Sequence, residues 1–399
     1  MSSPSKQIIP ILDLFRLLAA LLVALVHYEI IFGQFLIYGS FASTALSWFF
    51  VLSGFILAYN YPTLEGRQAY RRYYLHRFIR IYPIYALAVI LSVALIWIGY
   101  TVMGEGIFGS VRRPFELSYD LPEQKDHGFF LWAALRHLTF TQSIGGMETL
   151  KFLFNGPLWS LVLEVYFYLF FPLFLLLLRP INTLPRILIA FVVGYALQFM
   201  LILWFLPDTT DYNVMNLNVP VYTNPLIRGI EFVFGMLLYK AFILLPRPDP
   251  ERRAVLWPVA VASLAYALAN YIGETWIPYQ FSMFFVALPF VVLQVFTLIR
   301  ANWHPSEGLV RFCLWCGGMS YILYCFHWPI MEFVQLFDLL PETIPRPLHV
   351  VGLLTLFTVI CHLLYRHYES PLRRWLYRKL DQPRVERGIA LGHQHAGGR

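Results

Sequence analysis

Long apolar stretches alternate with short polar segments along most of this chain. Each is long enough for an α-helix to cross a bilayer, which takes roughly 20 residues. The pattern predicts ten membrane spans, at residues 8–31, 42–61, 81–103, 157–178, 187–206, 226–245, 254–272, 280–299, 317–337 and 348–365. No polar segment is long enough for a second domain, so we expect an all-α bundle forming a single membrane-embedded domain over residues 8–374. The longest gap, residues 104–156, is expected to be an extramembrane loop with room for short amphipathic helices, and residues 375–399 a disordered basic tail.

The composition excludes an ordinary soluble protein. The chain is 58% hydrophobic and 13% charged, whereas soluble domains are about a quarter charged. With the N-terminus in the cytoplasm, 22 of the 30 lysines and arginines lie on the cytoplasmic side and seven on the other. This bias sets orientation, so both termini are predicted to be cytoplasmic, and the net charge of +7 is not a sign of nucleic-acid binding. Asp13 and Arg16 interrupt the first span, which therefore does not read as a cleaved signal peptide.

Two ionisable side chains lie inside the first span. Arg16 and His27 have ten residues between them, and eleven helical steps make about three turns and rise about 16 Å, so both lie on one stripe. Ionisable groups at membrane depth usually face a bundle interior, a wet cavity or a reaction path. The alternative is that Arg16 extends to one interface and His27 is a hydrogen-bonded packing residue. Two such residues on one stripe favour a functional site.

Polar residues of the second and third spans allow two interpretations each. Ser53 precedes Gly54 in an aromatic span, where the pair permits close helix packing, while Ser53 would also suit a polar channel. Arg77 and Arg80 lie three apart, on one face of an expected short cytoplasmic helix before the third span. Such residues anchor topology, and a fixed pair of guanidinium groups also suits a phosphate-rich ligand such as a nucleotide or coenzyme A.

Glu164 lies two turns inside the fourth span, which carries no positive residue before Arg179. A carboxylate at this depth needs a partner. One interpretation is a structural pair with an arginine elsewhere in the bundle. The other is that Glu164 acts directly, by orienting His27 or by holding an acceptor hydroxyl.

The later spans contain a pair of charges, a histidine and a cysteine pair. Arg228 and Glu231 are three residues apart and are interpreted as a structural pair. His327 could help to line a cavity, although a packed, hydrogen-bonded histidine is the favoured interpretation. Cys313-x-x-Cys316 has no second ligand pair nearby, so we expect packing cysteines and no metal site.

Taken in order, these motifs resemble the acyltransferase-3 family of membrane acyltransferases. The motifs are Arg16-x10-His27, Phe49–Phe55, Arg77-x-x-Arg80-Ile81-x-Pro83, Trp159-Ser160-Leu161-x-x-Glu164-x-x-Phe167-Tyr168, Glu231-Phe232-x-x-Gly235, Ser320-Tyr321-x-x-Tyr324-x-x-His327-x-Pro329 and Tyr368-Glu369-x-Pro371-Leu372-Arg373-Arg374. They extend over residues 13–374, nearly the whole chain. The chain departs from the family pattern at Leu14-Phe15, where many relatives carry Gly-Leu, and at Ser370, which is often lysine. The hydrolase-like domain that follows the spans in some members is not expected here.

The resemblance implies an integral O-acyltransferase of the plasma (bacterial inner) membrane. It would transfer an acyl group, most often acetyl, from cytoplasmic acyl-CoA to a hydroxyl of a glycan, a lipid-linked sugar or another hydroxylated acceptor. His27 would act as general base, Arg16 would stabilise the thioester oxyanion, and Glu164 would assist. Arg77 and Arg80 would hold the coenzyme A phosphates. The residues expected to line the cavity are Asp13, Ser53, Trp159, Ser160, Tyr324 and His327.

Alternatives of other classes remain at this stage. A transporter or flippase of a lipid-linked sugar would also need many spans and buried charges, but it needs no coenzyme A site. A receptor or assembly subunit would not require His27. Within the acyltransferase interpretation, a covalent acyl-histidine relay is the less favoured variant. No tightly bound cofactor is expected, and acyl-CoA is the expected donor substrate.

Overall fold

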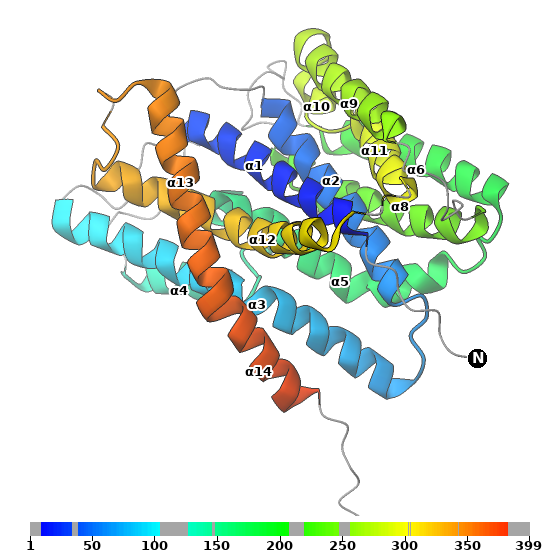
Figure 1. Ribbon diagram of the computed structural model, residues 1–399, viewed down its shortest axis with the longest axis horizontal. Coiled ribbons are helices and arrows are strands. Elements are labelled where there is room, and N and C mark those ends of the chain that lie inside the picture. Colours follow the sequence, from blue (N-terminus) through cyan, green and yellow to red (C-terminus); the bar gives the residue numbers. More distant parts are fainter. Residues whose placement is uncertain are drawn as a thin grey trace, which may run out of the picture.

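The computed structural model describes residues 9–33, 39–103, 127–145, 148–206, 219–246, 256–301, 303, 305–341 and 343–381. Within these ranges every regular element is helical, as the apolar pattern predicted, and the long helices pack side by side (Figure 1). Seven of the described helices are long and apolar enough to cross a membrane. They are α1 (Pro10–Phe32), α2 (Gly39–Asn60), α3 (Gly66–Met103), α5 (Trp159–Leu177), α6 (Leu184–Phe205), α12 (Glu307–Leu336) and α13 (Arg346–Leu364).

The other three predicted spans are also helical, but they are more polar or shorter. They correspond to α8 (Pro225–Leu244), α9 (Trp257–Trp276) and α11 (Leu288–Arg300). Helix α8 carries Arg228, Glu231 and Lys240, and α9 carries Asn270 and Glu274. Helix α11 has 13 residues, which rise about 20 Å against a hydrocarbon core of about 30 Å. The count of ten spans therefore stays a prediction, and so does the orientation.

Shorter elements connect the long helices. They are α4 (His127–Leu138), η1 (Glu148–Phe152), η2 (Gly156–Leu158), α7 (Val219–Tyr222), α10 (Tyr279–Ser282), the π-helical turn η4 (Tyr365–Glu369) and α14 (Ser370–Leu380). The predicted loop 104–156 thus contains helix α4, while its residues 104–126 lie outside the described residues.

Two boundaries predicted from the sequence were wrong. Arg77 and Arg80 do not lie on a separate short helix, because α3 runs without a break for 38 residues, about 57 Å at 1.5 Å per residue. The disordered tail was expected from residue 375, but α14 continues to Leu380, where contacts with α3 hold it. Residues 382–399 of that tail lie outside the described residues.

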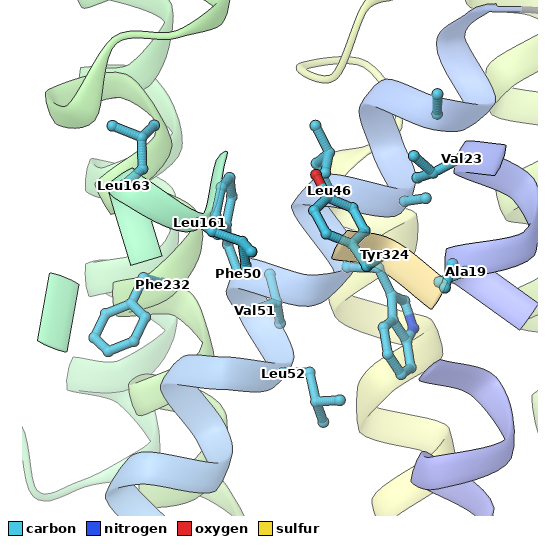
Figure 2. Close-up of a cluster of buried hydrophobic side chains, with 14 of the residues drawn as sticks. Ala19, Val23, Leu46, Phe50, Val51, Leu52, Leu161, Leu163, Phe232 and Tyr324 are labelled. Atoms are coloured by element: carbon cyan, nitrogen blue, oxygen red, sulfur yellow. The ribbon is translucent and has the colours of Figure 1, made fainter. Parts of the chain in front are cut away.

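Helix α2 lies at the centre of the core. Its apolar segment is 83% buried, more than that of any other candidate span among the described helices. In Figure 2 the side chains of α2 lie between those of α5 and α8 on one side and those of α1 on the other. Those of α2 are Leu46, Phe50, Val51 and Leu52; those of α5 and α8 are Leu161, Leu163 and Phe232; and those of α1 are Ala19 and Val23. The helix is thus positioned to present residues to a site between α1 and α5.

Two glycines bring the backbones of α2 and α8 together. A Cβ atom on Gly54 would collide with the carbonyl group of Phe232, and one on Gly235 would collide with that of Val51. Small residues allow such contacts within membranes, where helix association depends on close van der Waals packing. The packing interpretation of Gly54 is therefore confirmed.

Two adjacent glycines of α12 each accommodate a side chain from another helix. A Cβ on Gly317 would collide with the Asp13 carboxylate of α1, and a Cβ on Gly318 would collide with the Tyr365 ring of η4. Helix α12 is therefore packed between α1 and the end of α13 at one level. The packing leaves no room for a side chain at either glycine.

Proline residues inside the helices leave carbonyl groups that other helices satisfy. Pro329 has no N–H, so the carbonyl of Cys325, four residues earlier in α12, loses its helical donor. The Asn155 side chain donates a hydrogen bond to that carbonyl, with Nδ2 and O 3.0 Å apart. In a membrane a freed backbone group needs such a replacement. This hydrogen bond explains why the Asn155–Gly156–Pro157 segment is held against α12.

Pro172 creates the same situation in α5. The carbonyl of Tyr168 loses its helical donor, and the Tyr73 hydroxyl donates to it at 2.8 Å. The Tyr74 hydroxyl donates to the next carbonyl, that of Leu169, at 3.1 Å. Consecutive tyrosines of α3 thus fix the part of α5 that follows Glu164.

Candidate active site

A cavity lies among α1, α2, α3, α5 and α12. Its polar lining comes from two arginines, a carboxylate, and serine and tyrosine hydroxyls, and leucine, isoleucine and phenylalanine side chains complete it. Five residues predicted from the sequence meet here: Arg16, Arg80, Ser160, Glu164 and Tyr324. These residues come from four different helices and are as much as 308 positions apart in the chain.

Arg16 lines the cavity and contacts Asp13, which lies outside the cavity lining. Its Nη1 atom lies 3.5 Å from Oδ1 of Asp13, and both side chains are 22% exposed. The Asp13 carboxylate in turn occupies the space above Gly317. Asp13 was expected to line the cavity and does not. It acts as a positioning residue, because it fixes a cation that would otherwise be free to leave the bundle.

Glu164 accepts hydrogen bonds from two hydroxyl groups. Ser53 Oγ donates at 2.7 Å, and the Tyr168 hydroxyl also donates to the same oxygen, Oε1. The described contacts of Glu164 do not include His27, so the carboxylate does not orient that ring in this structure. Ser53, which was expected in the cavity lining, lies behind Glu164. Glu164 shares the cavity with Arg16 and Arg80, whose positive charges balance its own.

His27 forms a hydrogen-bonded pair with His327 of α12. Their atoms Nδ1 and Nε2 are 2.9 Å apart, and the rings stack with centroids 5.1 Å apart. His327 Nδ1 lies 3.0 Å from the carbonyl oxygen of Leu323. His327 is buried and hydrogen-bonded, as the packing interpretation predicted, but its pairing with His27 was not predicted from the sequence.

The hydrogen bonds of this pair determine which nitrogen of His27 is basic. A carbonyl oxygen only accepts, so Nδ1 of His327 carries the proton. In the neutral ring Nε2 of His327 is then an acceptor, and Nδ1–H of His27 must donate to it. The remaining nitrogen of a neutral His27, Nε2, has a free lone pair. This is the tautomer that a general base requires.

Tyr324 connects the cavity with the histidine pair. Neither His27 nor His327 lines the cavity itself, but Tyr324 does, and its ring centroid lies 5.9 Å from that of His327. The Tyr324 hydroxyl is hydrogen-bonded to Ser160 and to the carbonyl oxygen of Pro157, the latter at 3.1 Å. Arg16 and His27 are thus at opposite ends of one region, with Tyr324 between them.

Trp328 and Glu332 complete the surroundings of His27, and the sequence analysis missed both. The edge of Trp328 meets the His27 ring, with centroids 5.3 Å apart, and its Nε1 donates to Oε1 of Glu332 at 2.6 Å. The rule that drew attention to Glu164, a carboxylate inside an apolar span, would also have found Glu332. Trp159 was expected in the cavity but packs against Tyr222, with centroids 4.8 Å apart.

The two arginines predicted to bind phosphate lie in different surroundings. Arg80 lines the cavity. The Arg77 guanidinium lies instead over the rings of Tyr61 and Tyr168, 5.4 and 5.8 Å from their centroids. Three helical steps turn about 300°, so their heads diverge by roughly 60°, and the tertiary neighbours determine where each one points.

An exposed ion cluster lies on α3 beside Arg77. Asp381, just after α14, is 3.0 Å from Arg72 Nε and 3.0 Å from His76 Nε2. Slight burial opposes the charge of this carboxylate, but the hydrogen bonds from His76 and Arg72 outweigh it and lower the pKa of Asp381. The Tyr61 hydroxyl, 3.0 Å from His76 Nδ1, extends the cluster. The end of α14 is thereby fixed to the same part of α3 as the arginines.

Arg228 and Glu231 form the predicted structural pair. Their Nη1 and Oε1 atoms are 3.2 Å apart and both side chains are fully buried. The Arg228 guanidinium also lies 5.3 Å from the ring centroid of Phe50, and Phe50 lines the cavity. The pair therefore supports one cavity wall from outside. The cysteines, including Cys313 and Cys316, are buried and unpaired.

Comparison with known proteins gives one consistent result. A profile of the acyltransferase domain matches residues 9–366. Peptidoglycan O-acetyltransferase OatA of Listeria monocytogenes is 24% identical over 385 residues, which cover 93% of this chain and 56% of the relative. O-acetyltransferase OatA of Staphylococcus aureus is 27% identical over 235 residues, 54% of this chain and 36% of the relative. The chain thus spans about half the length of the curated relatives it matches, or less. No solved structure matches it significantly.

Proposed function

The chain belongs to the acyltransferase family, and we propose that it is an integral membrane O-acyltransferase with acetyl-CoA as donor and a glycan hydroxyl as acceptor. Membership confirms the resemblance predicted from the motifs. The two relatives are named as O-acetyltransferases, one of them as a peptidoglycan O-acetyltransferase, which supports acetyl as the transferred group and a glycan as the acceptor class.

The observation that carries this proposal is the pairing of His27 with His327 next to a cationic cavity. His27 Nε2 removes the proton from the acceptor hydroxyl, and the resulting oxygen attacks the thioester carbonyl carbon. The C–O bond forms, the C–S bond breaks, and the coenzyme A thiolate leaves. Protonated His27 then gives this proton to the thiolate, directly or through water, so that coenzyme A departs as the thiol and His27 is neutral again. General-base assistance of this kind contributes roughly 10²- to 10⁴-fold.

His327 and Arg16 support the charged states of this reaction. While His27 carries the acceptor's proton, its Nδ1–H stays hydrogen-bonded to His327, which keeps the ring in place. Arg16, fixed by Asp13, supplies a positive charge for the thioester oxyanion. Glu164 keeps the two cavity arginines from repelling each other and offers an acceptor for a substrate hydroxyl.

The donor enters from the end of the cavity that Arg80 lines. Arginine binds phosphate through two parallel hydrogen bonds, and Arg77 adds positive charge one turn away on α3. We assign this end to the cytoplasm, together with both termini, from the bias of lysines and arginines. The apolar pattern supports ten spans, and the bacterial relatives support a plasma membrane, the bacterial inner membrane, as their location.

The test compares cells that express the wild-type chain, His27→Ala or no copy. Mass spectrometry of their surface glycans should show an acetyl ester with the wild type and its loss in the other two. Purified wild-type protein should release free coenzyme A from acetyl-CoA when the extracted glycan is added. A glycan that is exported less but acetylated normally would instead indicate a flippase.

A further inference from the structure

A second cavity lies outside the site described above. It lies where the end of α2, the connection to α3, the end of α5 and the last turns of α8 meet. Pro172 lines it, four residues beyond Tyr168 of the first cavity. The two cavities are therefore neighbours along α5 but share no residue.

The walls of this second cavity combine an apolar surface with separate charges. Leu175, Leu176, Met236 and Ile243 are among its apolar residues, and Leu176 and Ile243 are 63% and 59% exposed. Such exposed aliphatic side chains on a membrane helix face lipid. The cavity is thus open to molecules that arrive from the bilayer.

The charged lining consists of Arg179, Lys240 and Glu65. Over the described ranges of the chain, none of the three makes an ion pair. Arg179 directly follows the last residue of α5, and Lys240 lies in the last turns of α8. Two cations and one carboxylate therefore surround an apolar cavity without neutralising one another.

We propose that this cavity binds a membrane phospholipid with an ammonium headgroup, such as phosphatidylethanolamine. Lys240 and Arg179 hold the phosphate, Glu65 accepts from the ammonium group, and an acyl chain covers the aliphatic wall. A free phosphate would leave that wall uncovered, and a free hydrocarbon would leave the cations without a partner. A headgroup with a phosphate but no ammonium would leave Glu65 unmatched.

The location gives the bound lipid an effect on the first cavity. It contacts α5 at Pro172, where the helix lacks a backbone hydrogen bond and depends on Tyr73. Glu164 lies two turns before this point on the same helix. The lipid supports the end of α5 and thereby the position of the carboxylate. This inference does not depend on the proposed acyl transfer, because lipid binding is measured without it.

The test uses the full chain purified in detergent and native mass spectrometry. Phosphatidylethanolamine, phosphatidylglycerol and phosphatidylcholine are added in equal amounts. We expect the wild type to retain phosphatidylethanolamine, and Lys240→Ala with Arg179→Ala to reduce this retention by about tenfold. The matched control is Arg186→Ala, a cation in the first turn of α6 that, among the described residues, bonds to Pro180 and Asn182 and does not line the cavity. Equal retention in the double variant and this control would overturn the proposal.

Three further measurements define the ligand. Lys240→Arg should retain the lipid, which guards against misfolding of the alanine variant. Glu65→Gln should remove the preference for phosphatidylethanolamine over phosphatidylglycerol. Inorganic phosphate alone should not displace the lipid. Displacement by phosphate, or retention of phosphatidylcholine equal to that of phosphatidylethanolamine, would show that the assigned headgroup contacts are wrong.

Discussion

At the residue scale, the chemistry of His27 depends on a residue 300 positions away in the chain. Sequence position and spacing indicated His27 and Arg16, because ionisable residues are rare inside apolar spans. They could not indicate His327 as the partner, since hydrogen bonds between distant helices depend on how those helices pack. For the same reason Arg77 and Trp159 were misplaced. Local patterns identify unusual residues but not their neighbours.

The histidine pair makes a graded prediction. His27→Ala should lower kcat by roughly 10²- to 10⁴-fold, while acetyl-CoA binding stays nearly unchanged. His327→Ala should lower kcat by about 10- to 100-fold, the range seen for metal-bound histidines that lose an orienting partner. His327→Gln should recover part of this loss, because its amide oxygen can accept from His27. Steady-state kinetics would measure these effects, and a His327→Ala enzyme with wild-type kcat would contradict the assigned tautomer.

The different surroundings of the two arginines predict unequal effects on donor binding. Arg80→Ala should raise the KM for acetyl-CoA by about tenfold, because Arg80 lines the cavity and Arg77 does not. Arg77→Ala should raise the KM less. In the wild type, added salt should weaken acetyl-CoA binding, because it screens the charges of both arginines. Isothermal titration calorimetry would measure the affinity of each variant for acetyl-CoA. Equal losses in both variants would mean that the phosphates lie outside the cavity, near Arg77.

At the element scale, the ten apolar stretches are helical over most of their described residues, although a turn at 283–287 interrupts one of them, so the pattern predicted helix type well. Helix ends were harder. The extended α14 ends where Asp381 contacts Arg72 and His76 of α3, and no local signal in the sequence marks such contacts. Asn155 lies just before the motif that begins at Trp159 and was not singled out from the sequence, because its role in satisfying a carbonyl group depends on the position of Pro329.

The hydrogen bond from Asn155 to the Cys325 carbonyl can be tested with a double-mutant cycle. Asn155→Ala should lower the free energy of unfolding by about 1–3 kcal/mol, because a buried carbonyl is left without a donor. In a Pro329→Ala background the loss should be smaller, since position 329 then has a backbone N–H that can donate. Thermal unfolding in detergent gives both values. Additive losses would argue against the replacement role of Asn155.

Helix α4 should loosen as the pH falls. Burial lowers the pKa of His137 to about 4, although its hydrogen bond to the Leu150 carbonyl opposes this. An unfolded histidine titrates near 6.5, so the neutral, buried ring stabilises the fold above that pH. This stability is lost as the pH falls from about 6.5 to about 4, on the order of 3 kcal/mol in all.

Hydrogen exchange of α4, corrected for intrinsic rates, measures this effect at pH 7 and pH 5. The control is His137→Gln, whose amide can also donate to Leu150 but does not titrate. We expect faster exchange at pH 5 in the wild type and no such change in the control. Identical exchange at both pH values in the wild type would refute the prediction.

At the scale of the whole molecule, the bundle places the cavity arginines and the histidine pair at different depths along its helices. Arg16, at the cationic end with Arg80, lies eleven positions before His27 in α1, about 16 Å along the helix. Under the proposed function, a donor that enters at one end and an acceptor that reaches the other would meet without either crossing the bilayer. The composition predicted the bundle, but the arrangement of its helices required the structure.

The orientation can be tested by labelling single introduced cysteines. Glu307→Cys, at the start of α12, should react with a membrane-impermeant maleimide only after cells are permeabilised. Leu339→Cys, between α12 and α13, should react in intact cells. Background labelling should be low, because the native cysteines are buried: Cys313, Cys316, Cys325 and Cys361. The reverse pattern would invert the assigned topology.

The paired glycines of α12 also act at a distance. Gly317 and Gly318 each leave room for one side chain from a different helix, so α12 cannot turn about its axis without a collision. His327 lies ten residues further along the same helix, about 15 Å away. Any rotation of α12 about its axis at the glycines would also rotate His327, because the residues of one continuous helix turn together. The orientation of His327, which accepts the hydrogen bond from the proposed general base His27, is therefore set ten residues away, at the paired glycines of α12.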